Sequence, residues 1–394
     1  MNNPFEFGRE LSDLEIVDRD QEIQEVVRTI HNRGRLFLIG PRRFGKTSIL
    51  RAAAERARKE GAVVFRYNAE AYPSLTVLAE RIVTDAAKEL TGPIRKAGRK
   101  IQEVFGALQP QLTYDPVSDT FSATLGQPGR RTSSSGRQAE EMLLSDTLAG
   151  LNRLAGMTSA PVAVIIDEFQ AVVEEGGPKA EGQLRAAVQT HDNVGYVFAG
   201  SKTRMLSEMT GDEGRPFYRL GERHFVGPVP REDFRLFIAG GFEHGGLEIV
   251  EEAIETILDL SQDVPYNVQR LAHACWNHAR ESSQTMSSQC VTAVLHHLVS
   301  RDDPFYTQTW NRISASQKRA LHAIVYTLGT GLFSGDITRM FGLRTPSSMQ
   351  AALQGLMKAG IAWENEHRGT TRYRLEDPFL AVWITLFTVP PKER

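Results

Sequence analysis

Cysteine is nearly absent from the sequence. Cys275 and Cys290 are the only two among 394 residues, which excludes a disulfide framework and suits a reducing compartment. Apolar runs are also short, because none approaches the roughly 18 residues that a membrane-spanning helix needs. The first ten residues contain neither an apolar stretch nor a cleavage site of small residues, so they are not typical of a signal peptide. We therefore expect a cytoplasmic protein with no membrane partner.

A strong net charge is missing as well, since the formal value is −2. The charge is nevertheless unevenly distributed along the chain. Residues 1–230 carry 30 Lys/Arg and 30 Asp/Glu, residues 231–304 carry 5 and 12, and residues 305–394 carry 11 and 6, giving 0, −7 and +5. Only the last segment has a long-range field that attracts nucleic acid, and this field is modest. The length predicts two or three domains, and we place them at 1–230, 231–304 and 305–394.

The clearest motif follows the apolar residues 36–39. It reads Gly-Pro-Arg-Arg-Phe-Gly-Lys-Thr-Ser and precedes an amphipathic helix, which fits G-x-x-x-x-G-K-[ST] between a strand and a helix. The glycines allow main-chain N–H groups to face a phosphate, and the first helical turn adds donors and a positive dipole end. We expect Lys46 to bind the β- and γ-phosphates and the Thr47 hydroxyl to coordinate Mg²⁺. The residues expected to hold a nucleoside triphosphate are Gly40, Pro41, Arg42, Arg43, Phe44, Gly45, Lys46, Thr47 and Ser48.

A second chemical signal lies at the end of the apolar residues 161–166, where Asp167 and Glu168 follow. A buried strand that ends in an acid places its carboxylate at the carboxyl edge of a parallel sheet, where open α/β sheets bind ligands. We expect Asp167 to hold the hydration shell of Mg²⁺ and Glu168 to accept a proton from the attacking water. The carboxylate beside the metal-binding acid favours hydrolysis over transfer to a second substrate. The pattern therefore indicates a motor or switch rather than a small-molecule kinase.

Polar residues after the next expected strand, at 194–200, supply further candidates. Ser201 is either a sensor of the γ-phosphate or a cap for the helix that begins near Lys202. Arg215 and Arg219 precede the last expected strand, at 224–226. Each is either a surface ion-pair partner or an arginine that reaches a phosphate in its own or a neighbouring subunit. Arg219 is our candidate for the second role.

Helical periodicity continues after residue 230. Segments 231–239, 248–260, 267–281 and 287–298 predict a helical lid, in which Pro265 begins one helix and is expected to lie against the nucleotide base. Residues 91–137 contain a basic cluster, an alternating segment at 111–125 that predicts a hairpin around an Asp-Pro turn, and a loop-like composition at 126–136, and we treat them as an insertion in the nucleotide domain.

The last part of the chain predicts a winged helix, with helices at 317–328, 334–341 and 347–359 and an alternating segment at 361–375. In one interpretation helix 347–359 lies in the major groove of DNA and the arginines approach phosphates. In the other, the winged helix is a packing module. The residues expected at DNA are Arg344, Ser347, Gln350, Arg368, Arg372 and Arg374.

Several of these motifs recur in order in one known family. They are the phosphate loop, Ile-Ile-Asp-Glu-Phe-Gln, Ala-Gly-Ser, a Tyr-Arg segment and Tyr373-x-Leu-x-Asp-Pro-Phe before Trp383. Together they resemble the archaeal-type ATPase family, a branch of the signal-transduction ATPases with numerous domains, close to origin-recognition-type AAA+ proteins. The resemblance implies an α/β fold: a P-loop NTPase core with a parallel sheet and a catalytic Glu, then a helical lid and a C-terminal winged helix. It also implies ATP as the nucleotide. Many members carry Gly-x-Pro where this chain has Asp-Val before Pro265.

Three functional hypotheses follow. The first is an ATP-binding and ATP-hydrolysing molecular switch, Mg²⁺-dependent, which couples its nucleotide state to a partner through the lid and the winged helix. The second is a DNA-binding AAA+-like ATPase in replication, mobile-element or defence biology. The third is a nucleotide-bound scaffold with little turnover. A protein partner is expected to bind residues 91–137 or the winged helix, and self-association is expected to depend on nucleotide.

Overall fold

The computed structural model describes residues 2–11, 16–90, 94–108, 110–115, 120–125, 136–367 and 370–388. Its contacts divide the chain into two compact units. The α/β unit consists of Glu10–Gly227, and the helical unit consists of Met1–Arg9 with Pro228–Arg394. The expected boundaries near residues 230 and 304 stay predictions. No helix in the described part of the chain combines the length and the apolar character that crossing a membrane requires.

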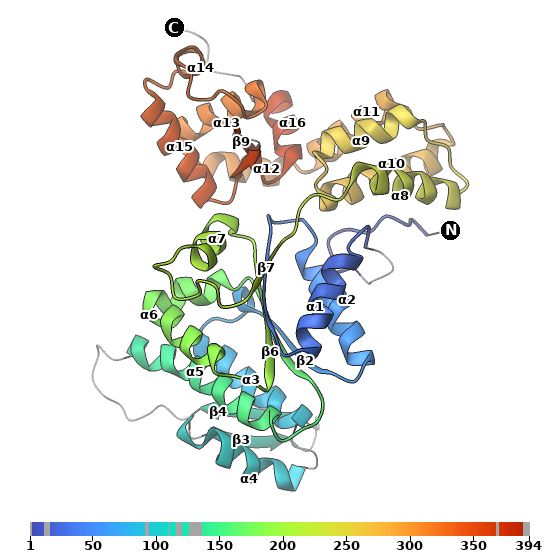
Figure 1. Ribbon diagram of the computed structural model, residues 1–394. Helices are drawn as coiled ribbons and strands as arrows, with labels where there is room; N and C mark the ends of the chain where they lie inside the picture. The colour runs from blue at the N-terminus through green and yellow to red at the C-terminus, as the bar shows by residue number, and fades with distance from the viewer. Residues whose placement is uncertain are drawn as a thin grey trace. The chain divides into compact units, whose positions relative to one another are not determined.

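A five-stranded parallel sheet forms the centre of the α/β unit (Figure 1), in the order β2-β5-β6-β1-β7. Its strands are β1 (Arg35–Ile39), β2 (Val63–Asn68), β5 (Val162–Asp167), β6 (Val194–Gly200) and β7 (Glu222–Phe225). Strands β1, β5 and β6 are buried along almost their whole length. Such continuous apolar runs are typical of a parallel sheet covered on both faces. Consecutive strands are joined through helices, as parallel pairing requires.

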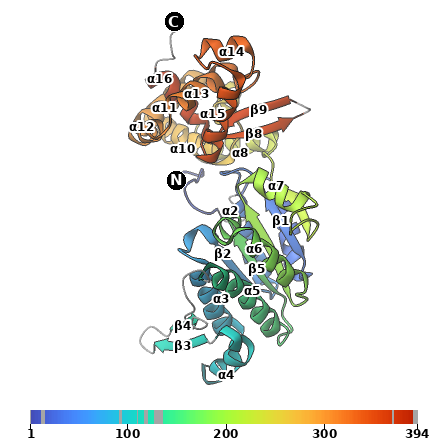
Figure 2. The same ribbon diagram turned by 90° about the vertical axis from the view of Figure 1, so that its left-hand side faces the viewer.

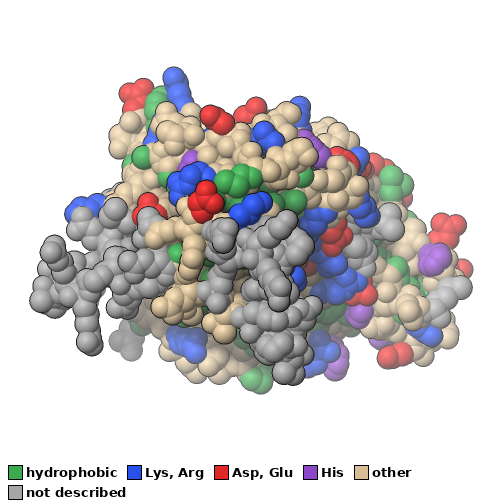
Figure 3. All heavy atoms as spheres, turned by 90° about the horizontal axis from the view of Figure 1, so that it is seen from below, with side chains coloured by type: hydrophobic (Ala, Val, Ile, Leu, Met, Phe, Trp, Pro, Cys, Tyr) green, Lys and Arg blue, Asp and Glu red, His purple; other side chains and the backbone are tan. Residues whose placement is uncertain are grey.

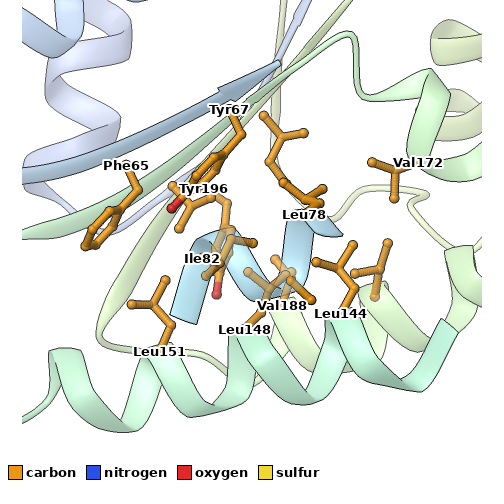
Figure 4. Packing of buried hydrophobic residues seen from close by; sticks show 14 of the residues in the cluster. Phe65, Tyr67, Leu78, Ile82, Leu144, Leu148, Leu151, Val172, Val188 and Tyr196 are labelled. Carbon is orange, nitrogen blue, oxygen red and sulfur yellow. The ribbon is translucent and has the colours of Figure 1, made fainter. Parts of the chain in front are cut away.

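Helices cover both faces of this sheet. They are α1 (Asp20–His31), α2 (Lys46–Lys59), α3 (Leu75–Leu90), α5 (Gly136–Ala155), α6 (Gln170–Gln189) and α7 (Thr203–Gly211), with the short 3₁₀ helix η2 (Ala69–Ala71). Figure 4 shows the packing on the α3–α5–α6 side, where Tyr67 and Tyr196 of the sheet meet Ile82 and Leu148 of the helices. Because side chains alternate along a strand, the intervening residues point to the opposite face, toward α1 and α2. This layered packing fixes the carboxyl ends of the strands at one edge.

A small subdomain lies between α3 and α5 in sequence. It contains α4 (Ile94–Phe105), the 3₁₀ helix η3 (Gly106–Leu108) and the antiparallel hairpin of β3 (Pro110–Asp115) and β4 (Thr120–Leu125). Side chains of α3 hold β4 in place, since Thr84 Oγ1 accepts from Ala123 N (2.9 Å) and Glu80 accepts from Leu125 N (3.0 Å). The hairpin expected at 111–125 therefore forms, although its turn after Asp115 and other parts of the segment 91–137 lie outside the described residues.

The helical unit begins with four helices that follow the expected periodicity: α8 (Arg231–His244), α9 (Glu251–Ser261), α10 (Pro265–Ser282) and α11 (Ser288–Arg301). The N-terminal segment packs on them. Phe5 is fully buried against Phe237 and Phe242, and Asn3 donates to His273 O and to Asn277. These contacts explain why the first nine residues belong to this unit.

The remaining elements are α12 (Asp303–Arg312), α13 (Ala315–Thr327), α14 (Gly335–Met340), α15 (Pro346–Lys358), β8 (Ala362–His367), β9 (Thr370–Leu375) and α16 (Pro378–Phe387). Three helices and a hairpin form the winged helix, and Figure 2 shows the β8–β9 hairpin extending from α13–α15. Asp377 joins this part to the lid helices, because its carboxylate accepts from Asn267 of α10 (3.0 Å) and from Tyr306 of α12 (3.1 Å).

Candidate functional site

The loop expected to bind phosphate connects β1 to α2. Its backbone turns through two left-handed residues, Arg43 with φ 67° and Gly45 with φ 87°. Left-handed residues that alternate with right-handed ones turn successive main-chain N–H groups toward one concavity, which binds anions. At the start of the loop, a Cβ on Gly40 would lie 2.8 Å from the carbonyl oxygen of Val226. Glycine is therefore required at position 40, because the backbone of Val226 leaves no room for a side chain.

Lys46 is the first residue of α2, and its side chain returns over the loop. The residue is only 4% exposed, and Nζ donates to Gly40 O and to Pro41 O, each at 2.8 Å. A buried ammonium needs such acceptors because desolvation of an unpaired charge is costly. The same ammonium lies at the centre of the loop, so it can exchange these carbonyls for phosphate oxygens.

Thr47 and Asp167 meet across the sheet edge. The Thr47 hydroxyl donates to Asp167 Oδ2 at 2.7 Å, and Asp167 Oδ1 accepts from Glu168 N at 2.9 Å. Asp167 is the last residue of β5 and is 2% exposed. A hydroxyl and a carboxylate side by side are hard oxygen donors of the kind that Mg²⁺ prefers. These two residues therefore fit a magnesium site, and among the described residues no cluster of three or more His, Cys, Asp or Glu suggests another metal site.

Glu168 has an unusual backbone conformation for a residue with a side chain, with φ 50°. Residues held in this region store strain and concentrate at functional sites. Its Oε2 accepts the Ser201 hydroxyl (2.8 Å), the Ser201 main-chain N–H (3.3 Å) and the amide of Gln170. One carboxylate oxygen therefore receives three donors, which fix the carboxylate between the ends of β5 and β6.

The two adjacent acids differ in their electrostatic surroundings. Burial raises the pKa of Asp167, although the Thr47 hydroxyl opposes this change. Burial also acts to raise the pKa of Glu168, but the Gln170 amide, the Lys46 charge and the Ser201 hydroxyl outweigh it, so that this pKa is lowered. Opposite shifts in neighbouring carboxyls are typical of sites in which each acid has its own task.

Ser201 follows β6 and is 9% exposed. The Ser201 hydroxyl does not cap the next helix, which was one of its two expected roles. Helix α7 has Lys202 at its N-cap and no side-chain cap hydrogen bond. The hydroxyl donates to Glu168 and accepts from Arg42 Nε at 3.4 Å, while Arg42 also reaches Glu70 at 3.2 Å. Ser201 thus links the phosphate loop to the acidic pair.

The two arginines before β7 differ in their contacts. Arg215 pairs bidentately with Glu181 of α6, at 3.2 and 2.7 Å, and Glu181 is 1% exposed. Arg185 of α6 donates to the carbonyls of Pro216 and Tyr218 and so fastens the same segment. Arg219 is exposed, with its guanidinium over the Tyr218 ring at 4.9 Å. Arg215 therefore anchors the segment, and Arg219 is presented at the surface.

Replacing Arg215 by alanine is expected to lower the free energy of unfolding by on the order of 2 kcal/mol, because it leaves the Glu181 carboxylate buried without its ion-pair partner. This value is below that of a fully buried pair, since Arg215 itself is 33% exposed. Urea unfolding of the full chain measures the change. Arg219→Ala is the matched control and should stay within about 0.5 kcal/mol of the wild type, so equal losses in both variants would contradict the anchoring role.

The remaining expected site residues lie in the helical unit. Pro265 is the first residue of α10. Arg344 precedes α15, while Ser347 and Gln350 are exposed on that helix. On β9, Arg372 and Arg374 are partly exposed, and Arg372 Nε donates to Leu328 O at 2.8 Å. Burial lowers the pKa of Arg374, and the neighbouring Arg372 charge adds to this shift. Arg368 lies outside the described residues.

Sequence reasoning missed Gln170 as a site residue. It begins α6, is 1% exposed, and donates its amide to Glu168 and to Ser201 Oγ (3.4 Å). The sequence signal that could have identified Gln170 is its position two residues after Glu168. A helix that begins there places its first polar side chain at the same edge of the sheet. Gly200 provides the space, because a Cβ at that position would lie 2.2 Å from Gln170 Oε1.

Comparisons with known proteins find two matching domain families and a shared fold. Residues 15–193 match the AAA ATPase domain family, and residues 304–386 match a probable winged helix domain. The fold is similar to that of the Walker-type ATPase of Pyrococcus abyssi, at 18% identity and a TM-score of 0.62, with 97% of this chain and 100% of that chain covered. It is also similar to the ORC2 protein of Aeropyrum pernix in its ADPNP–ADP complexes, at 18% identity and a TM-score of 0.52, with 94% and 92% covered.

No curated protein matches the chain closely enough to count as a relative. At 18% identity the solved structures show a shared fold, and the two matched regions include strands β1, β2 and β5 of the sheet and the terminal winged helix. The chain therefore combines a region that matches the AAA ATPase domain family with a region that matches a probable winged helix domain, and it shares its fold with these two solved structures.

Proposed function

We propose that this protein is an ATP-hydrolysing molecular switch, in which the nucleotide state controls a partner through the lid and the winged helix. The observation that carries the proposal is the set of contacts around Glu168. Its carboxylate is fixed by Ser201 and Gln170 directly beside the Thr47–Asp167 pair. A base held next to a magnesium-binding pair suits activation of a water molecule more than simple retention of a nucleotide.

Each residue then has a task in hydrolysis. Lys46 exchanges the carbonyls of Gly40 and Pro41 for the β- and γ-phosphates, and the loop N–H groups surround the phosphate chain. Thr47 and Asp167 would hold Mg²⁺, which neutralises charge that develops on the phosphate oxygens. Glu168 orients the attacking water and accepts its proton at a carboxylate oxygen.

The same contacts provide a basis for switching. Glu168 Oε2 now accepts three hydrogen bonds, and Lys46 is held by main-chain carbonyls. Binding of ATP replaces part of this network with contacts to the γ-phosphate, and hydrolysis restores it. Because only the triphosphate makes these contacts, it biases the protein toward one of two states.

The test is an ATPase assay with and without duplex DNA, combined with a mass measurement with and without nucleotide. A switch should turn over ATP slowly, and its rate or its assembly state should respond to DNA or to nucleotide. Turnover that is absent under all of these conditions would contradict the proposal. Assembly with ATP alone would implicate the exposed Arg219 in contacts between subunits.

Ser201→Ala is expected to lower turnover about tenfold while the KM for ATP changes little, because one hydrogen bond to the Glu168 carboxylate is lost. Steady-state phosphate release measures both quantities. Ser207→Ala, on α7 and partly exposed, is the control and should retain wild-type rates. Unchanged turnover in Ser201→Ala would show that the link between Ser201 and Glu168 serves packing alone.

A second candidate function is DNA binding by the winged helix. The observation that favours it is the exposed face of α15, which contains no Asp or Glu. Residues 305–394 have a charge of +5, so the domain as a whole attracts a polyanion. By contrast, on the surface seen from below in Figure 3, acidic and basic side chains are interspersed. Duplex binding that weakens with salt and on replacement of Arg372 and Arg374 tests this function.

A further inference from the structure

The exposed face of α15 is a narrow polar stripe. Its exposed side chains are Pro346 in the first turn and then Ser347, Gln350, Ala351, Gln354 and Lys358. At 100° per residue, the five positions after Pro346 fall within an arc of roughly 100°. The opposite face packs into the domain through Met349, Ala352, Leu353 and Leu356, which are all buried. The stripe is therefore held by a rigid helix, and its side chains point away from the core.

The chemistry of this stripe argues against a protein partner. Protein interfaces depend on large aromatic, aliphatic or arginine anchors at their centre. The exposed apolar residues of the helix are Ala351 and the first-turn Pro346, with Met357 half-buried at the margin, and the one cation of the helix is Lys358 at its end. A helix that reads DNA instead presents uncharged amides at its centre to the edges of the bases and cations at its margins to the phosphates. Arg344 lies just before the helix, so a cation is found near each end.

Glutamine has a defined role at base edges. Its carboxamide makes two hydrogen bonds to N6 and N7 of adenine in the major groove, and an alanine methyl packs against the methyl group of thymine. Gln350 and Gln354 are one helical turn apart, with Ala351 between them on the same stripe. Four residues of helix rise by about 6 Å, which spans about two base-pair steps of roughly 3.4 Å.

We propose that α15 reads A·T base pairs in the major groove of duplex DNA through Gln350 and Gln354, with Arg344 and Lys358 on the flanking phosphates. The proposal rests on the second candidate function, DNA binding, and adds to it the base type and the residues that select it. Gln354 is new among the expected DNA contacts. The two adenines are expected within about three base pairs of each other.

The experiment selects duplexes with the full-length protein from a pool of 20-base-pair DNA with a randomised centre. Anisotropy then compares the selected duplex with a shuffled one. The expected selection contains two adenine positions, and Gln350→Ala and Gln354→Ala should each lose about tenfold preference at one of them. Affinity for the shuffled duplex should not change, because the substitutions remove no charge. Both residues are exposed, so the variants are expected to fold.

Two controls separate base reading from phosphate binding. Gln308→Ala removes an exposed glutamine of α12 and should retain the full preference. Lys358→Ala should weaken binding to both duplexes equally and lower the salt slope by about 1.

A preference that survives in both α15 glutamine variants, or binding without any preference, would overturn the specificity inference and leave DNA binding intact. No binding of any duplex at about 50 mM salt would overturn DNA binding and this inference together, while the ATPase proposal would stand.

Discussion

Lys46→Ala is expected to abolish ATP binding at micromolar nucleotide concentrations. The ammonium makes two short hydrogen bonds at the centre of the loop, to Gly40 O and Pro41 O, and these are the bonds that phosphate oxygens would take over. Hydrogen bonds to charged groups contribute about 1.5–3 kcal/mol each. Loss of two such bonds corresponds to a fall in affinity of about 100-fold or more. Isothermal titration calorimetry with ATP and Mg²⁺ measures this loss directly.

Lys59→Ala is the matched control for that experiment. Lys59 is the last residue of the same helix and is exposed, so its removal changes the net charge equally without touching the loop. Its affinity for ATP should equal that of the wild type. Micromolar binding retained by Lys46→Ala would contradict the assignment of the loop as the phosphate site, whatever the result for turnover.

Local patterns were sufficient to predict the strand, loop and helix segments on which the candidate site lies. The phosphate loop and the Asp167–Glu168 strand end are specified by residue types at fixed spacing, and parallel pairing brings both to one sheet edge. The lid helices and the wing hairpin followed from apolar periodicity. Their ends were less exact. The helix expected at 317–328, for example, is α13 at Ala315–Thr327, because Ser314 is its N-cap and its hydroxyl accepts from Gln317 N.

The contacts that depend on tertiary packing could not be predicted in the same way. The hydrogen bond from Ser201 to Glu168 joins residues 33 positions apart, and the strain at Glu168 has no sequence signal. Helix α16 is apolar on nearly every side, so no 3.6-residue period marks it. Its place follows from contacts made by Trp383, which donates to Asp303 of α12 at 2.8 Å. Such long-range pairs become visible only when the chain is folded.

Glu168→Gln is expected to bind ATP as tightly as the wild type but to lower turnover by about 10²–10⁴-fold, the usual contribution of a general base. The substitution keeps the shape of the side chain, and its carbonyl oxygen can still accept from Ser201 and Gln170. What is lost is the negative charge that takes the proton from water. Phosphate release under saturating ATP measures turnover, and calorimetry on the same preparation measures binding.

Glu174→Gln is the control for this variant, because Glu174 pairs with the exposed Lys202 at the surface and lies on the same helix as Gln170. It should hydrolyse ATP at the wild-type rate. Turnover that is unchanged in Glu168→Gln would remove the role of Glu168 as the base in hydrolysis. Loss of binding and turnover together would instead assign Glu168 to nucleotide retention. Only retained affinity with lost turnover fits a base that acts on water after the nucleotide is bound.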